Sequence, residues 1–522
     1  MAATAQDADP QRPDPVRGPL SSTVDASAGA WWRHRLDRWR LQAAGSAVSC
    51  WLFLRLLGVV YLIAFASLSG QIIGLAGARG ILPVAPFLEA VHQQLGAAGY
   101  WLAPTLCWVN ASDAALRGVC AAGIVLSVLL ILDVAPALTL GLLYAAYLSV
   151  ATICRDFLWF QWDSLLLEAG FLAIFLAPRR FAPRSAVDPP PSPLMLWLLR
   201  WLLFRVMFSS GVVKLASGDP TWRSLTALAF HYYTQPLPTW TSWYAHHWPL
   251  WFHRASCAMV FVLELLVPWL IFGARRARRL AFALLCLLQT LIAATGNYGF
   301  FNLLTIVLCV LLLDDEVWPH RWRVIGGSLG ARARWPSWLT VPVGAIIGVL
   351  SIVPMLGVLR EPVRAAPLVA AYRALAPFRL VNSYGLFAMM TTSRPEIILE
   401  GSRDQREWRA YEFFDKPGDV RRAPRFVAPY QPRLDWQMWF AALGGLEDTR
   451  WFLPLCERLL EGSPDVLALL KDNPFPDAPP RYLRATVYDY AFTDTATRRA
   501  DGAWWRRTRR DLYCPVLALP SS

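Results

Sequence analysis

The stretch MLWLLRWLLFRVMFSSGVVKLASGDPTW, residues 195–222, decides the fold class of this chain. Its apolar part is long enough to cross a hydrocarbon layer of about 30 Å, which takes roughly 20 mostly apolar residues. The run carries Arg205 and ends in Lys214, about where a membrane boundary should lie. We therefore expect a membrane-spanning helix near 194–215 in which cations such as Arg205 and Lys214 need partners.

The composition extends this expectation to the whole chain. Of the 522 residues, 56% are hydrophobic and 17% are charged, which favours a polytopic membrane protein over a soluble globule. The net charge of +13 lies in short arginine clusters between apolar runs, so it indicates membrane topology and no nucleic-acid partner. Residues 1–45 begin with a polar stretch rich in Ala, Pro, Asp and Ser, and we expect a disordered cytoplasmic tail there.

Apolar runs recur through residues 46–360, which we expect to form one multi-pass domain of about nine helices. The expected spans lie near 51–69, 117–133, 136–154, 161–178, 194–215, 256–273, 279–296, 299–313 and 338–358.

Orientation follows from the loops, because positive residues stay on the cytoplasmic side. One set of alternate loops holds Arg33, Arg35, Arg38, Arg40, Arg179, Arg180, Arg184, Arg275, Arg276, Arg278, Arg279, Arg321, Arg323, Arg332 and Arg334. The opposite set holds Arg79, Arg155, Arg223 and Arg254. An odd number of spans with a cytoplasmic N-terminus places residues 361–522 outside the cytoplasm, in a lumen or periplasm.

Residues 361–522 have a different composition, with short β-rich runs separated by turn residues. Strands are expected at 384–390, 396–400, 409–414, 481–492 and 502–517, and helices at 433–445 and 448–462. The predicted fold is therefore an α-helical polytopic membrane bundle followed by a C-terminal extracytoplasmic β-rich domain that resembles a β-sandwich.

Carboxylates inside the apolar runs are the first candidates for a site, because an unpaired charge in hydrocarbon is costly. Asp163 and Glu168 lie five positions apart in one expected helix and so do not share one face closely. The helix dipole favours Asp163 at the helix start, and Glu168 is expected to bind a neighbouring helix. The alternative for both residues is a polar cavity that contacts a substrate or client.

Lys214 admits three interpretations. It forms an interhelical ion pair, for which Glu264 and Glu168 are the candidate partners of Lys214 and Arg205. Alternatively, burial lowers its pKa and makes it a general base. The third interpretation is that the side chain extends to the outer interface.

Two outer loops carry further polar candidates. Asn297, in the sequence TGNYGFFNLLT (295–305), belongs either to a tight turn or to a polar cavity shared with Lys214. The aromatic-rich loop 216–255 contains His246 in a group of four histidines that lacks metal-ligand spacing. We expect no metal, and without a P-loop or G-x-G-x-x-G we expect no nucleotide or other cofactor.

The cysteines indicate no cluster, because all nine occur singly. Cys456 and Cys514 lie in the C-terminal domain, where they would be able to pair in an oxidising compartment. The sequence does not fix that pairing.

Several blocks between about 155 and 445 resemble the lipase maturation factor family. They are FLWFQWDSLLLEAGFLAIFLAP (157–178), SSGVVKLASGDPTWRSLTAL (209–228), HYYTQPLP (231–238), TGNYGFFNLLTIVLC (295–309), VNSYGLFAMMTTSRPEIILEGS (381–402) and FVAPYQPRLDWQMWFAAL (426–443). A fainter similarity links Gly211, Lys214, Leu215 and Trp222 to a pattern in the membrane domain of vitamin K-dependent carboxylases. That similarity implies that Lys214 acts as a base.

The first resemblance implies a membrane factor, of the endoplasmic reticulum or of a bacterial inner membrane, that assists folding and assembly of secreted lipases. Its partners would be lipase clients and membrane lipids, with client contact through the C-terminal domain and its aromatic residues, such as Trp408 and Trp436. The alternative is a membrane enzyme that acts on a lipophilic or secreted substrate with Lys214 as its base, and with Asp163, His246 or Asn297 nearby.

Overall fold

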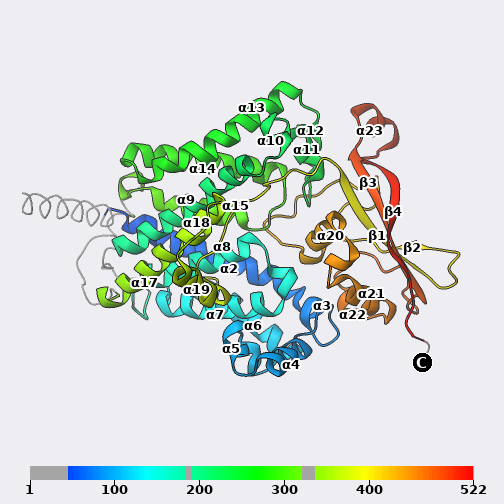
Figure 1. The fold of residues 1–522 in the computed structure, drawn as a ribbon, viewed down its shortest axis with the longest axis horizontal. Coiled ribbons are helices and arrows are strands. Elements are labelled where there is room, and N and C mark those ends of the chain that lie inside the picture. The colour runs from blue at the N-terminus through cyan, green and yellow to red at the C-terminus, as the bar shows by residue number, and fades with distance from the viewer. Residues whose placement is uncertain (1–44, 184–190, 320–321, 323–334, 521–522) are drawn as a thin grey trace, which may run out of the picture.

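The computed structural model describes residues 45–183, 191–319, 322 and 335–520. Almost all of the expected tail 1–45 lies outside these ranges, as do the loop arginines Arg184, Arg321, Arg323, Arg332 and Arg334. Figure 1 shows a large helical bundle with a β-sheet at one end of it, and short helices between the two.

Seven of the described helices are long and apolar enough to cross a membrane, which confirms a multi-pass helical bundle. They are α2 (Ala47–Ser69), α6 (Asp113–Ile131), α7 (Pro136–Ile153), α9 (Pro193–Ala216), Leu250–Phe272, which begins with α13 (Leu250–Phe261), α14 (Arg275–Thr295) and Ser337–Val358, which joins α17 (Ser337–Leu350) to α18 (Ile352–Val358).

Two of the expected spans form shorter helices. The first is α8 (Gln161–Leu176), with 16 residues, and the second is α15 (Phe301–Cys309), whose apolar helical path continues to Leu312. Most residues of both are buried by neighbouring helices, and such cover reduces the apolar length that a helix inside a bundle requires.

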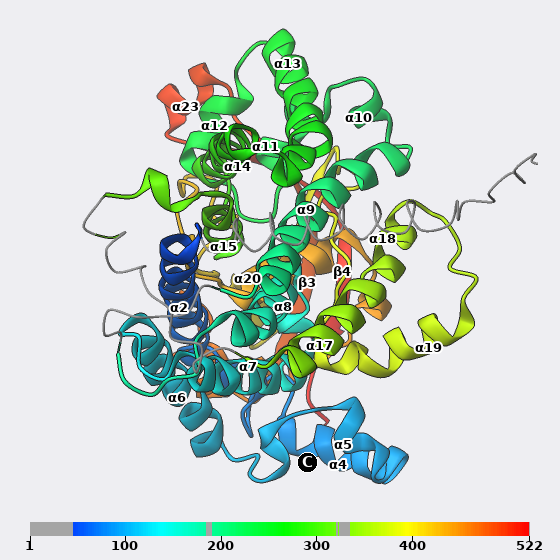
Figure 2. The same cartoon turned by 90° about the vertical axis from the view of Figure 1, so that its left-hand side faces the viewer.

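Short helices occupy the connections. They are α3 (Ile72–Ala76), α4 (Val84–Leu95), α5 (Ala98–Leu102), α10 (Pro220–Arg223), α11 (Ala227–Thr234), α12 (Trp240–His246) and α19 (Ala366–Leu375). Further 3₁₀ turns lie at Leu106–Trp108, Arg155–Leu158, Asp315–Val317, Ala376–Phe378 and Leu446–Asp448, and two more, Val267–Phe272 and Val310–Leu312, end the apolar helical paths described above. Viewed along the bundle in Figure 2, α4 and α5 project from one side and α19 from another.

The bundle has two chemically different ends. At one end, Asp315 accepts hydrogen bonds from the backbone N–H groups of Ala47 and Val48 at the start of α2, and Arg279 of α14 pairs with Asp314 at 2.6 Å. At the other end, the segment after α2, the start of α8 and the turn between α14 and α15 all contact the C-terminal domain. Loops of the arginine-rich set therefore lie at the end opposite to the sheet.

The C-terminal domain is built on a four-stranded antiparallel sheet with strand order β2-β1-β3-β4. The strands are β1 (Arg394–Ser402), β2 (Arg409–Ala410), β3 (Tyr482–Phe492) and β4 (Trp505–Leu517), and the helices are α20 (Arg433–Leu443), α21 (Phe452–Leu460), α22 (Pro464–Leu467) and α23 (Thr495–Asp501). In register, Ile397 opposes Val487 and Ala485 opposes Cys514. Ile397, Leu399, Ala485 and Cys514 join the core that α20 and α21 share with the bundle.

The sequence therefore predicted a β-rich domain correctly, but the sheet arrangement and two of the strands differ from the prediction. The described residues contain one sheet covered by helices, where a sandwich needs two sheets. The expected strand at 384–390 is a loop, because its polar groups bind bundle side chains instead of a neighbouring strand: the N–H of Gly385 donates to Gln161 at 3.0 Å and that of Met390 to Asp219 at 2.9 Å. The expected strand at 409–414 ends after Ala410.

Candidate functional site

Lys214 lies on the last turn of α9 and forms a buried ion pair with Glu264. Its Nζ lies 2.9 Å and 2.7 Å from the two carboxylate oxygens and 3.0 Å from the carbonyl of Ser210. The ammonium also lies 5.4 Å from the centre of the Trp222 ring. An ammonium has three N–H donors, and these three oxygens provide one acceptor for each of them. The interhelical ion pair expected from the sequence is therefore confirmed.

The backbone around Glu264 is shaped to make this contact. Val262–Leu266 forms a single π-helical turn between α13 and the 3₁₀ turn that follows, an irregularity often found at functional positions. Gly211 of α9 faces this turn, and a Cβ placed there would lie 2.7 Å from Leu265 Cδ2. The glycine therefore permits α9 to approach closely enough for Lys214 to reach Glu264.

A cavity of about 90 Å³ adjoins the pair. Most of its lining is apolar, and its polar residues besides the ion pair are Ser210, His231, Gln289, Tyr298 and Asn302. Tyr298 donates to Gln235 at 2.8 Å, and Asn302 donates to Gln289 at 2.8 Å. At roughly 30 Å³ per water molecule, the space suits a few waters.

The other candidates do not line this cavity. Glu168 of α8 pairs with Arg205 of α9, the second pair expected from the sequence. The other Glu168 oxygen accepts the N–H of Asn382 at 3.0 Å and the hydroxyl of Tyr384 at 2.7 Å. Glu168 thus joins two helices and fixes the loop that was predicted to be a strand.

Asp163 joins the bundle to the C-terminal domain. It lies in the first turn of α8, as expected, and its two oxygens accept bonds of 2.7 Å and 2.9 Å from Arg433 at the start of α20. Tyr147 of α7 donates to the same carboxylate at 2.5 Å. Both charged side chains have 0% exposure, so the pair is wholly withdrawn from water.

Asn297 makes a second connection across the same junction. Its Nδ2 donates to the Arg425 carbonyl at 2.8 Å, and its Oδ1 accepts N–H groups from Val427 at 2.8 Å and Ala428 at 3.0 Å. The turn expected for Asn297 is present between α14 and α15, but its amide serves the C-terminal domain and not the Lys214 cavity.

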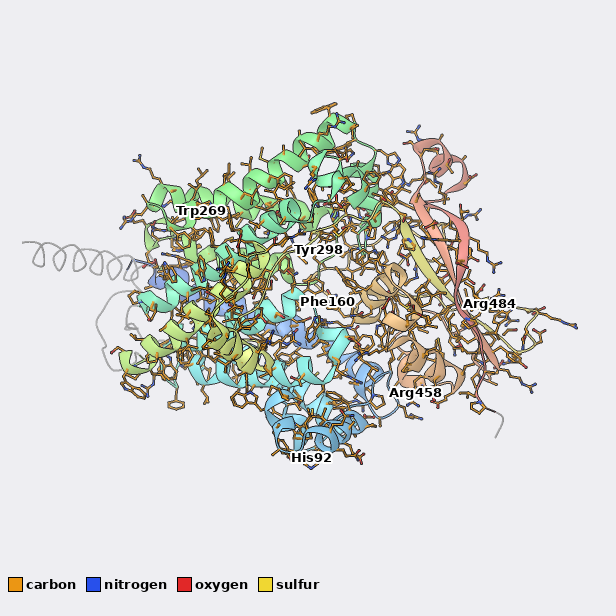
Figure 3. The ribbon with its side chains drawn as sticks, in the orientation of Figure 1. His92, Phe160, Trp269, Tyr298, Arg458 and Arg484 are labelled. Carbon is orange, nitrogen blue, oxygen red and sulfur yellow. The ribbon has the colours of Figure 1, made fainter. Side chains whose placement is uncertain are left out.

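Besides Arg433, sequence reasoning missed Gln71 and Arg394 at this junction. Gln71 accepts the backbone N–H of Arg433 at 2.8 Å and donates to the Gln431 carbonyl at 2.9 Å. Arg394 of β1 donates to the Pro236 carbonyl at 2.8 Å and pairs with Glu396 at 2.7 Å. The only available signal was that each is a polar residue inside or beside an apolar segment. Figure 3 shows Phe160 and Tyr298 in this region, between the long helices and the sheet.

The aromatic candidates differ in exposure. Trp436 is 3% exposed and packs inside the junction, with its ring centre 4.8 Å from that of Trp162. Trp408 is half-buried on the sheet beneath Arg484, whose guanidinium lies 4.1 Å from the ring centre. Arg484 lies on the sheet, away from the bundle (Figure 3).

Among the titratable groups outside the spans whose pKa values are altered, His246 and Asp435 lie near the junction of the bundle and the C-terminal domain. His246 of α12 packs between Tyr233 and Phe492, with ring centres 5.1 Å and 5.7 Å away. Burial of the imidazole, aided by the neighbouring His247, lowers the pKa of His246 to about 4. Burial also raises the pKa of Asp435 in α20 to about 6, with a further contribution from the charge of Asp415.

The remaining candidates are the two cysteines. Cys456 of α21 and Cys514 of β4 are both buried, and no disulfide joins them. The neighbouring thiol of Cys514, together with burial, raises the pKa of Cys456. Within the described ranges, no group of three or more His, Cys, Asp or Glu side chains is arranged to hold a metal ion.

Two family models match the chain: the lipase maturation factor transmembrane domain over residues 48–320 and the lipase maturation factor C-terminal domain over residues 380–515. Lipase maturation factor 2 of Gallus gallus is 38% identical, with 90% of this chain and 81% of the relative covered. Lipase maturation factor 2 of Homo sapiens is 38% identical over 91% and 83%, and lipase maturation factor 1 of Homo sapiens is 34% identical over 98% and 93%. No solved structure matches the chain.

Proposed function

Since this chain belongs to the lipase maturation factor family, we propose that it is a membrane-embedded factor that assists folding and assembly of secreted lipases. The observation that carries the proposal is the match of both family domains together with seven spanning helices. The membrane is that of the endoplasmic reticulum, or the inner membrane if the chain is bacterial.

The client is contacted by the C-terminal domain, which lies outside the cytoplasm. Support comes from the two ends of the bundle: the arginine-rich start of α14 lies at the end opposite to the sheet, where positive residues favour the cytoplasm. Support also comes from the junction, because the buried pair of Asp163 and Arg433 fixes the domain to the membrane bundle. A client bound there would be held at the membrane surface.

A membrane enzyme with Lys214 as its general base is not supported. The relatives are named maturation factors, and the ammonium donates to Glu264 and to a backbone carbonyl. The role of Lys214 that fits these contacts is to join two spans of the bundle.

The test is co-expression with a secreted lipase in cells that lack their own maturation factor. The full chain should raise the lipase activity per amount of secreted lipase, and deletion of residues 380–520 should remove the effect while the bundle remains in the membrane. Equal lipase activity with and without the full chain would refute the proposal.

Topology is tested separately through Cys456 and Cys514. In an oxidising compartment a disulfide-bearing oxidant would convert the two thiols into one disulfide and be reduced to two thiols itself. Alkylation and mass analysis of protein from intact cells should therefore find Cys456 linked to Cys514. If both thiols remain reduced and a C-terminal tag is digested from the cytosolic side, the proposed orientation is wrong.

A further inference from the structure

Strand β4 is the longest strand of the sheet and stands at its open edge. It has 13 residues, about twice the usual strand length, and it is the last strand in the order β2-β1-β3-β4. An edge strand of this length offers a row of backbone N–H and C=O groups to any extended chain that approaches it.

The strand is anchored at both ends and exposed between them. Trp505 is 2% exposed and packs on Phe492, and Cys514 is 0% exposed against the helical layer. From Arg506 to Leu512 every residue is exposed. In Figure 1, β4 lies on the side of the domain that faces away from the helical bundle, so this surface does not face the lipid layer that the spans would cross.

The exposed part of β4 is strongly basic. Its sequence RRTRRDL, residues 506–512, carries four arginines and one aspartate. Two of the arginines have local contacts: Arg507 donates to the Tyr490 hydroxyl at 3.2 Å, and Arg510 lies 3.5 Å from the half-exposed Asp489. Within the described ranges, the guanidinium groups of Arg506 and Arg509 make neither a hydrogen bond nor an ion pair, and both residues are exposed, so their positive charges face solvent.

We propose that β4 is the client-docking edge, and that it binds an extended, net-negative polypeptide segment of an incompletely folded client by strand addition. The inference rests on the proposed function for the identity of the client. Backbone hydrogen bonds to the open edge would give binding without a defined sequence, and the four arginines would select acidic segments. The exposed side chains of Leu512 and Val516, at 46% and 44%, supply apolar contact beside the charges.

A purely protective role is the competing explanation, because charged residues on an edge strand also prevent unwanted pairing. The two explanations differ under charge reversal. Glutamates on an edge strand prevent unwanted pairing as well as arginines do. A strand with a purely protective role therefore tolerates the replacement of its arginines by glutamates. A docking edge that selects acidic segments does not.

The test uses the full-length protein in lipid nanodiscs and overlapping 15-residue peptides that cover a secreted lipase. We expect binding to concentrate on net-negative peptides and to weaken as salt is raised. Arg506→Glu with Arg509→Glu should weaken it at least tenfold, whereas Arg506→Lys with Arg509→Lys should retain it. Arg406→Glu with Arg409→Glu, the same charge change at exposed positions beside and on β2, at the opposite edge of the sheet, is the matched control and should have no effect.

Strand addition has its own readout, which is slower hydrogen exchange of the 506–512 amides when a peptide is bound. The proposal is overturned if the glutamate pair binds peptides normally, if affinity does not depend on peptide charge, or if those amides gain no protection. It is also overturned if heparin or anionic vesicles, and no peptide, bind in an arginine-dependent manner. Lipase maturation is measured in parallel. Loss of maturation with Arg506→Glu and Arg509→Glu supports docking at β4, and normal maturation with this variant refutes docking at β4. The proposed function as a maturation factor is refuted only if the full unsubstituted chain has no effect on the lipase.

Discussion

Two buried ion pairs in this molecule have similar chemistry and different tasks. Lys214 and Glu264 connect two segments of the same bundle beside a small cavity. Arg433 and Asp163 connect two domains, and both side chains have 0% exposure. A charge near the end of a spanning helix therefore does not indicate catalysis by itself. What matters is whether its donors and acceptors are already satisfied, and by which part of the chain.

The largest effect is expected at the interdomain pair. Arg433→Met leaves the Asp163 carboxylate buried with only Tyr147 as a side-chain donor, and we expect a loss of about 3 to 5 kcal/mol in the free energy of unfolding. Denaturant titration in detergent micelles measures it. The double variant Asp163→Leu with Arg433→Met should recover most of the loss, because neither charge then remains buried.

Arg409→Met is the matched control for that experiment. Arg409 is 63% exposed and lies 3.9 Å from Glu407, so its removal should change stability by less than about 1 kcal/mol. Arg433→Met should also detach the C-terminal domain and increase its cleavage by protease while the bundle remains intact. If Arg433→Met and Arg409→Met have equal effects, the junction does not depend on this pair.

The intrabundle pair should be less sensitive. Lys214→Met leaves Glu264 without its cation, but the adjacent cavity has room for water, so we expect a loss of roughly 2 to 3 kcal/mol in the same titration. Lys214→Met with Glu264→Leu should recover both stability and lipase maturation. A folded double variant that has lost maturation would contradict the structural role and show that the cation itself is required.

The sequence predicted one pair better than the other for a physical reason. Lys214 and Glu264 both lie in apolar runs, where each charge requires a partner, so the list of candidates was short. Arg433 lies in QPRLDWQ, which resembles an ordinary exposed helix start, and its partner is 270 positions away. Apolar length and arginine clusters predict spans and their direction, but they contain no information on how two domains dock.

The wrongly predicted strand at 384–390 has the same origin. Tyr384 and the apolar residues after it are typical of a strand, and nothing local reveals that Glu168 accepts the tyrosine hydroxyl. Conversely, β1, β3 and β4 were predicted within a few residues, because alternating runs between turn residues are a local signal. Local patterns therefore found the elements, and the junction required the structure.

The smallest effect concerns a third contact across the same boundary, where His246 packs against Phe492 of β3. The pKa of His246 is lowered to about 4 in the native state, whereas it is about 6.5 in an unfolded chain. Between about pH 4 and pH 6.5, the imidazole therefore binds a proton in the unfolded state and not in the native state. Stability should therefore fall as pH drops from about 6.5 towards 4, by about 1 to 2 kcal/mol at pH 5.

His246→Phe keeps an aromatic ring at this position and removes the proton, so unfolding titrations at pH 7 and pH 5 should differ less for this variant than for the unsubstituted chain. His92→Gln, on α4 and away from the junction (Figure 3), is the control and should leave the pH dependence unchanged. An unchanged acid loss in His246→Phe would show that another group titrates at the boundary. A reduced loss would mean that acid weakens the outer contact first, while the buried pair of Asp163 and Arg433 still holds the two domains together.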